Sequence, residues 1–191
     1  APDVAPDLLG ALLRHGDVVL RITEVEAYGG ADDPGSHAYR GPTPRNATMF
    51  GPAGRLYCYF TYGMHVCSNV VTGAEGEGCG VLIRAGEVVE GLATARSRRP
   101  GASDRDLARG PARLTRAMAI ALQADGTDLA RGPIRLELPS VAPSRVRSGP
   151  RVGLRAAPDT PWRFWIDSDP TVSTYRPAAP PRPRTAPPDP I

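Results

Sequence analysis

The sequence predicts a single α+β domain, and three observations point to that class. The chain has 191 residues, a length that usually forms one domain with a substantial core. Two segments, residues 6–16 and 110–122, carry the apolar spacing of amphipathic helices. Other segments are rich in alternating β-branched and aromatic residues, as strands are, and no segment repeats another.

In the first half of the chain, PDLLGALLRHG (6–16) is expected to form a helix that ends at Gly16. VVLRITEVEAY (18–28) follows as a strand. Residues 29–54 are rich in Gly, Pro, Asp, Asn and Ser, which predicts a long loop, and long loops in compact domains are often functional. RLYCYF and MHVCSNVV then predict a β-hairpin over residues 55–71.

In the second half, VLIRAGEV (81–88) predicts another strand, and residues 110–122 predict a helix with Pro111 at its first position. WRFWI (162–166) is a late strand. One face of the helix collects Leu114, Met118, Ala121 and Leu122. Residues 177–191 contain seven prolines in fifteen positions, so we expect a domain over 1–176 followed by a Pro-rich disordered tail.

The basic residues are all arginine and are distributed unevenly. All 23 are Arg, and none is Lys. Residues 1–95 hold 6 Arg against 11 acidic residues, a net charge of −5, whereas residues 96–191 hold 17 Arg against 9, a net charge of +8. Such asymmetry suggests a polyanionic partner, because arginine binds phosphate through two parallel hydrogen bonds. A GC-rich genome would also replace Lys with Arg without functional meaning.

Several classes of protein are excluded by what the sequence lacks. No apolar run approaches the ~18 residues of a membrane span, and no signal-peptide pattern begins the chain. We therefore expect a cytoplasmic protein with its three cysteines reduced. No P-loop, metal-ligand spacing of histidines or zinc-deaminase signature occurs, so we expect neither a metal nor a cofactor.

The strand ITEVEAY raises a first question about chemistry. Alternation would place Ile22, Glu24, Glu26 and Tyr28 on one face. One alternative is a solvated edge with its polar residues directed outward. The other is a carboxylate held in a cleft as a general base.

A second question comes from YFTYGMHV, residues 59–66. Gly63 supplies the positive φ of a tight turn, so the hairpin places Tyr62 at its tip, in water. A large ring there buries nothing within its own chain, which suggests that it is buried against a partner.

Together these motifs resemble one known family. TEVEAYGG, HAYRGPTPRNATMF, LYCYFTYGMHVCSNV, VLIRAGE, GPARLTRAMAI, PRVGL and PWRFWIDSDPTVS are similar, in the same order, to the alkyladenine (3-methyladenine, methylpurine) DNA glycosylases. The similarity covers roughly residues 5–176. It implies one α+β domain with a curved antiparallel sheet, a protruding β-hairpin and flanking helices. It also implies a base-excision repair enzyme that flips alkylated or deaminated purines out of duplex DNA and hydrolyses the N-glycosidic bond. Since strand cleavage through a Schiff base generally needs an amine and the sequence has no Lys, we expect a monofunctional enzyme, and we expect a monomer.

The resemblance also assigns roles to single residues. Glu26 would be the general base, with Arg84 and the Val152 carbonyl holding the attacking water and Glu24 as a structural partner. Four residues would form the base pocket: Tyr28, His37, Tyr59 and Asn69. Asn69 would obstruct the amino group of normal guanine.

The same resemblance predicts the contacts with DNA. Tyr62 and Met64 would enter the base stack, while Thr43, Arg45 and Asn46 would grip the DNA backbone or support the pocket. His65 stands where the family often has Tyr, so this contact is expected to differ. A catalytically silent nucleic-acid-binding module and a nucleoside hydrolase remain as alternatives, and the sequence does not rank the damaged purines as substrates.

Overall fold

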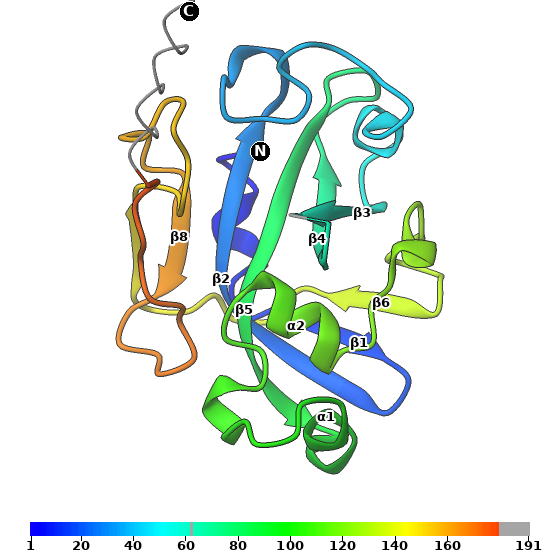
Figure 1. Ribbon diagram of the computed structural model, residues 1–191, viewed down its shortest axis with the longest axis vertical. Helices are drawn as coiled ribbons and strands as arrows, with labels where there is room; N and C mark the ends of the chain where they lie inside the picture. Colours follow the sequence, from blue (N-terminus) through cyan, green and yellow to red (C-terminus); the bar gives the residue numbers. More distant parts are fainter. Residues whose placement is uncertain (62, 180–191) are drawn as a thin grey trace, which may run out of the picture.

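One antiparallel sheet organises the residues that the computed structural model describes, which are 1–61 and 63–179 (Figure 1). Its eight strands are β1 (Leu12–His15), β2 (Val18–Gly29), β3 (Leu56–Thr61), β4 (His65–Thr72), β5 (Cys79–Glu90), β6 (Ile134–Glu137), β7 (Val146–Gly149) and β8 (Arg163–Ile166). The order is β3-β4-β5-β2-β1-β6, and β8 pairs with β2 and with β7. The two α-helices are α1 (Leu92–Arg98) and α2 (Pro111–Ala117), and short 3₁₀ turns lie between the other elements.

The long strands β2 and β5 form the centre of the sheet. Figure 1 shows them side by side along the molecule, with β1 and β6 turned across one end, so the sheet is curved. Helix α2 packs against β4 and β5. The result is the single α+β domain with a curved antiparallel sheet that the sequence and its resemblance predicted.

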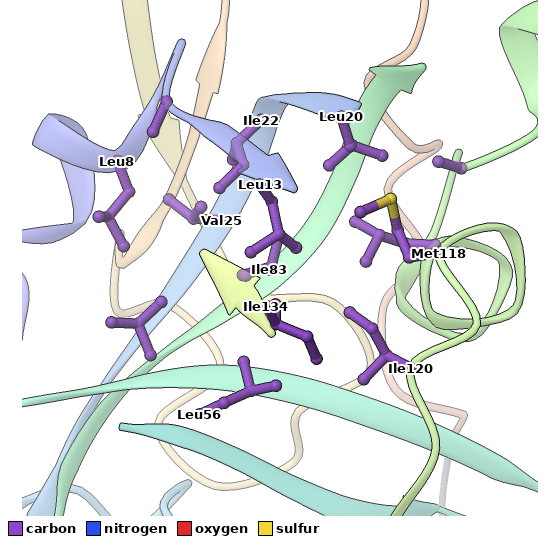
Figure 2. Close-up of a cluster of buried hydrophobic side chains, with 14 of the residues drawn as sticks. Leu8, Leu13, Leu20, Ile22, Val25, Leu56, Ile83, Met118, Ile120 and Ile134 are labelled. Carbon is purple, nitrogen blue, oxygen red and sulfur yellow. The ribbon is translucent and has the colours of Figure 1, made fainter. Parts of the chain in front are cut away.

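The hydrophobic core packs the sheet against the N-terminal turn, α2 and the segment that follows α2. Figure 2 shows Leu13, Ile22 and Ile83 from the sheet close to Met118 and Ile120, which follow α2. Each of these side chains is at least 96% buried. Burying one such side chain stabilises the fold by about 1.5–3 kcal/mol, so the core fixes the strands that carry the site.

The N-terminal helix predicted over residues 6–16 is wrong. Only Ala5–Leu8 forms a 3₁₀ turn, and Leu12–His15 is strand β1, paired with both β2 and β6. Gly10 has φ +83° and its N–H donates to the Ile22 carbonyl at 2.8 Å, which turns the chain into the sheet. A short apolar run suits a helix or a buried strand equally, and here pairing on both edges decides.

The helix predicted over residues 110–122 is confirmed only in its first half. Helix α2 ends at Ala117, and Ala119 turns the chain with φ +54°. Leu114 is buried as predicted, but Leu122 is 37% exposed, because the turn brings Ile120 into the core instead. The strands predicted over 18–28, 81–88 and 162–166 and the hairpin over 55–71 are confirmed, whereas β1, β6, β7 and α1 were not predicted.

Among residues 1–61 and 63–179, no helix combines the length and the apolar character that crossing a membrane requires. Two predictions fall on residues that the structure leaves undescribed. Tyr62 is one, and residues 180–191 of the predicted Pro-rich tail are the other.

Candidate active site

Irregular pairing between β2 and β5 directs two glutamates into the protein. The register shifts between Ile22 and Glu24 and again between Glu24 and Val25, so Thr23 interrupts the alternation. Ile22 therefore joins Val25 in the core, and its predicted place on the glutamate face is wrong. Glu24 and Glu26 are both 0% exposed, which also excludes the solvated edge.

Within residues 1–61 and 63–179, three donors converge on the buried Glu26 carboxylate. The Tyr28 hydroxyl donates to Oε2 at 3.0 Å, Arg84 Nη1 donates to the same oxygen at 3.2 Å, and the Val152 N–H donates to Oε1 at 2.6 Å. A carboxylate has about four lone-pair sites, so about one remains for a further donor such as water. The predicted contact of that water with the Val152 carbonyl stays a prediction.

Glu24 holds the arginine that meets Glu26. It accepts hydrogen bonds from Arg84 Nε at 2.9 Å, Arg163 Nε at 2.7 Å and the Ser173 N–H at 2.6 Å. Burial acts to lower the pKa of Arg84, but Glu26 and Glu24 outweigh it and raise that pKa above its ordinary value. Arg84 is therefore a permanent cation, fixed between the two carboxylates.

An aromatic cavity of about 140 Å³ lies beside Glu26. Its lining residues are Tyr28, Gly35, His37, Met49, Tyr57, Tyr59, Asn69 and Leu154. The rings of His37 and Tyr59 are 4.4 Å apart between centroids, and those of Tyr57 and Tyr59 stack at 5.5 Å. A cavity of about 150 Å³ is known to hold benzene, so this one suits a flat aromatic ring.

The titrating groups of the cavity are uncharged at neutral pH. Burial raises the pKa of Tyr57 to about 12, and burial followed by the Glu26 charge raises the pKa of Tyr28 well above its usual range. Desolvation by packed neighbours, and then the Arg45 charge, lower the pKa of His37. The cavity thus presents neutral rings to a ligand.

Asn69 contributes a polar group to this cavity. It is 4% exposed, and its amide nitrogen donates to the Tyr57 carbonyl at 3.1 Å. No other hydrogen bond of its side chain occurs in the described part of the chain, so the amide oxygen is available to a ligand.

The TPRN segment supports the cavity through Asn46. That side chain is 3% exposed, accepts from the Thr43 N–H at 2.6 Å and donates to the His37 carbonyl at 2.9 Å. Its position fits support of the pocket, and a contact of Asn46 with the DNA backbone stays a prediction. Arg45 is exposed and donates to the Phe60 carbonyl at 2.8 Å, beside the hairpin.

An arginine-rich groove runs between the β3–β4 hairpin and α2. Two hollows, of about 340 and 580 Å³, share His65, Ala112 and Arg113 in their walls and so form one groove. The arginines that line it are Arg84, Arg99, Arg109, Arg113, Arg116 and Arg176. Within residues 1–61 and 63–179, no Asp or Glu lines it.

Three arginines in the wider part of this groove, Arg99, Arg113 and Arg116, repel one another. Burial and the charges of Arg113 and Arg116 lower the pKa of Arg99, and the Arg99 Nε has no hydrogen-bond partner in the described chain. Neither Arg113 nor Arg116 forms an ion pair with a described residue. The charge of Asp106 offsets this repulsion only in part, so the cluster keeps a surplus of positive charge that suits anions such as phosphates.

The hairpin beside the groove exposes apolar side chains. Met64 is 72% exposed and Phe60 is 46% exposed, and His65 is also exposed. Tyr62, the residue predicted to enter DNA, lies outside the described residues. Met64 and His65 line the wider part of the groove, so the hairpin and the arginines face the same space.

The sequence did not single out a buried ion pair next to the site. Arg151 and Asp33 are 1% exposed, and two hydrogen bonds of 2.5 and 2.8 Å join them. The only sequence signal was the position of Arg151 immediately before Val152. Nothing in the loop sequence marked Asp33, 118 residues away.

Known proteins are similar to this chain over most of its length. The sequence profile of "Methylpurine-DNA glycosylase" matches residues 1–170. A protein of Leifsonia xyli subsp. xyli is 57% identical over 91% of this chain and 87% of its own length, and one of Streptomyces avermitilis is 54% identical over 96% and 91%. One of Frankia casuarinae is 52% identical over 94% and 90%. Each carries the name "Putative 3-methyladenine DNA glycosylase".

Proposed function

The chain belongs to the methylpurine-DNA glycosylase family, and from that premise we propose that it flips damaged purines out of duplex DNA and hydrolyses their glycosidic bond with water activated by Glu26. Membership itself makes the protein a hydrolase that cleaves N-glycosidic bonds. The finer steps concern which residues carry out the reaction, and on which bases.

The position of Glu26 between the cavity and the groove carries the proposal. Tyr28 lines the aromatic cavity, Arg84 and Val152 line the arginine-rich groove, and all three donate to Glu26. A nucleotide with its base in the cavity and its phosphates in the groove would have its sugar beside this carboxylate.

The reaction follows from that placement. The water oxygen forms a bond to C1′ of the sugar while the bond from C1′ to the base nitrogen breaks, and the bonding electron pair leaves with the base. Glu26 takes the proton of the water, and its charge stabilises the oxocarbenium-like sugar during bond breaking. The product is an abasic site. A strand cut through a Schiff base generally needs an amine, and the 191 residues contain no Lys, so we propose a monofunctional enzyme.

Selection of the base rests on stacking and on Asn69. Neutral aromatic rings attract alkylated, cationic purines by about 0.5–2 kcal/mol. We propose that the Asn69 side chain, held by its hydrogen bond to the Tyr57 carbonyl, occupies the space that the amino group of normal guanine would need. 7-Methylguanine carries the same amino group, and the attraction of its positive charge to the rings offsets this obstruction.

Flipping leaves a gap in the base stack, which costs a few kcal/mol. We propose that Tyr62 and Met64 fill that gap while the groove holds the phosphates, and that Arg45 meets the DNA backbone with Thr43 on the other side of the hairpin. We further propose a monomer that needs no metal or cofactor and works in the cytoplasm on the chromosome.

The test replaces the proposed base. Glu26→Gln keeps the shape of the side chain but accepts no proton, so single-turnover excision of 7-methylguanine or hypoxanthine from a duplex should fall about 10²–10⁴-fold. Duplex binding should stay near that of the wild type, and the wild-type product strand should break only after alkali.

Glu90→Gln is the matched control, because Glu90 lies exposed at the end of β5. It should excise at the wild-type rate. Turnover by Glu26→Gln within a few fold of the wild type would remove Glu26 from the proposed role, and loss of wild-type excision in EDTA would contradict a mechanism without a metal.

A further inference from the structure

Arg151 is a fully buried cation that binds its surroundings in three ways. Nη1 and Nη2 donate to the two oxygens of Asp33 at 2.5 and 2.8 Å, and Nη1 also donates to the Ala27 carbonyl at 3.0 Å. The guanidinium carbon lies 4.8 Å from the centroid of the Tyr28 ring and 5.3 Å from that of Trp162. The planar fork of arginine allows bidentate pairing and ring stacking at once, which lysine cannot do.

Asp33 is equally well held. It accepts from the Gly29 N–H at 3.1 Å and from the Gly35 N–H at 2.9 Å. Burial acts to raise the pKa of Asp33, but the hydrogen bonds from Arg151, Gly35 and Gly29 outweigh it and lower that pKa. The carboxylate is therefore charged, and it joins the end of β2 to the loop that carries the cavity wall.

The packing around the pair is tight. A Cβ at Gly35 would collide with the Leu154 side chain and lie 3.0 Å from Arg151 Nη2. Gly35 and Leu154 both line the aromatic cavity, whereas Arg151 and Asp33 do not. The pair thus lies behind the wall and does not meet a ligand directly.

Two of the three donors to Glu26 adjoin Arg151. Val152 follows it directly in the chain and places its N–H on Glu26 Oε1, and the Tyr28 ring, whose hydroxyl donates to Oε2, lies against the guanidinium. The third donor, Arg84, is fixed separately by Glu24.

Stability alone does not account for this buried pair. Replacing a buried ion pair by packed apolar residues is often neutral or stabilising, whereas directed hydrogen bonds define one geometry. We propose that Arg151 and Asp33 form a positioning pair, which holds the Val152 N–H and the Tyr28 hydroxyl on Glu26 and so sets the orientation of the carboxylate for water activation. This inference rests on the proposed function of Glu26.

Arg151→Lys and Asp33→Asn test the pair. Each keeps most of the volume but breaks the bidentate pairing, so the single-turnover excision rate constant, with enzyme in excess, should fall about 10–100-fold. The dissociation constant for a damaged duplex should change by less than about twofold. A purely structural pair would instead reduce the folded fraction, and hence the reaction amplitude, while the rate constant of the folded enzyme stayed at the wild-type value.

The control is Arg98→Lys, since Arg98 is a part-buried arginine that donates to the Ala117 carbonyl and lines neither the cavity nor the groove. It should keep the wild-type rate constant. If Arg151→Lys is too unstable to isolate, Asp33→Asn gives the same reading, because it leaves the arginine in place.

A double variant separates this inference from the proposed function. If the pair acts through Glu26, then Arg151→Lys combined with Glu26→Gln should be no slower than Glu26→Gln alone. Losses that multiply, or a wild-type rate in both single variants, would overturn the positioning pair and leave Glu26 in its role. Wild-type turnover by Glu26→Gln would overturn both.

Discussion

Glu26 receives its donors from three parts of the chain that only the fold brings together. Tyr28 is on the same strand, Arg84 is on β5 and Val152 follows β7. Hydrogen bonds to a charged group are stronger than neutral ones, so the carboxylate cannot rotate freely. The cavity beside this charged carboxylate is lined instead by rings that stay neutral at physiological pH.

At the residue scale, His37 should make excision depend on pH. Its folded pKa lies below 6.5, so its contribution to stability is complete above about pH 6.5 and is lost as the pH falls from there through the folded value. Protonated His37 would also repel a cationic base. Excision of 7-methylguanine should therefore decline below pH 6.5 more steeply than excision of neutral hypoxanthine.

The measurement is a single-turnover pH profile for both lesions. His37→Gln should remove the difference between them, whereas His15→Gln, on β1 away from the cavity, should keep the wild-type profiles. A His37→Gln profile that matches the wild type for both lesions would exclude His37 as the titrating group.

At the element scale, the sequence predicted those strands and turns whose formation depends on the local residue pattern. The hairpin and the long strands have turn residues and β-branched runs, and they formed as predicted. Strand β1 did not, because LLRH is compatible with a helix until β2 and β6 pair with it. The bulge at Thr23 has no sequence signal either, yet it moves Ile22 to the core and leaves the glutamates facing Arg84. The sequence could indicate the two glutamates as candidate site residues, but it could not predict their burial, which results from this irregular pairing.

The hairpin carries the prediction made for Tyr62. If Tyr62 stands in water at the turn, as the sequence predicts, Tyr62→Ala should change stability by less than about 0.5 kcal/mol. Stacking on a base contributes about 1–3 kcal/mol, so excision from a well-paired duplex should fall about ten- to a hundredfold, and less where the lesion is mispaired. Tyr39→Ala, at a tyrosine that is 48% exposed in the loop, should leave both rates unchanged. A lower melting temperature with wild-type excision would make Tyr62 a packing residue.

At the scale of the whole molecule, the acidic and basic halves of the sequence supply different parts of the candidate site. The glutamates of the site come from the acidic first half. Five of the six arginines that line the groove in the described chain come from the basic second half, and Arg84 is the exception. The charge count predicted a polyanionic partner. It could not predict the groove, because Arg99, α2 and Arg176 are separated in sequence and meet only after β5 has placed α2 against the hairpin.

The groove should therefore control the salt dependence of DNA binding. Arg113 and Arg116 lie exposed on one face of α2 without an ion-pair partner among the described residues, so replacing both with Ala should barely affect folding. Each lost phosphate contact should reduce the slope of log K against log salt concentration by about 0.9, so the double variant should lose about 2 in slope. Binding should weaken equally for damaged and undamaged duplexes, because phosphates carry no information about the base.

The matched control is Arg131→Ala with Arg135→Ala, which removes the same charge from exposed positions at β6 that line neither hollow. If both double variants lose the same slope, net charge alone attracts the DNA and the groove has no special part in binding it. If only the α2 variant does, the phosphate backbone lies between α2 and the hairpin, where Glu26 can reach the sugar of a flipped nucleotide.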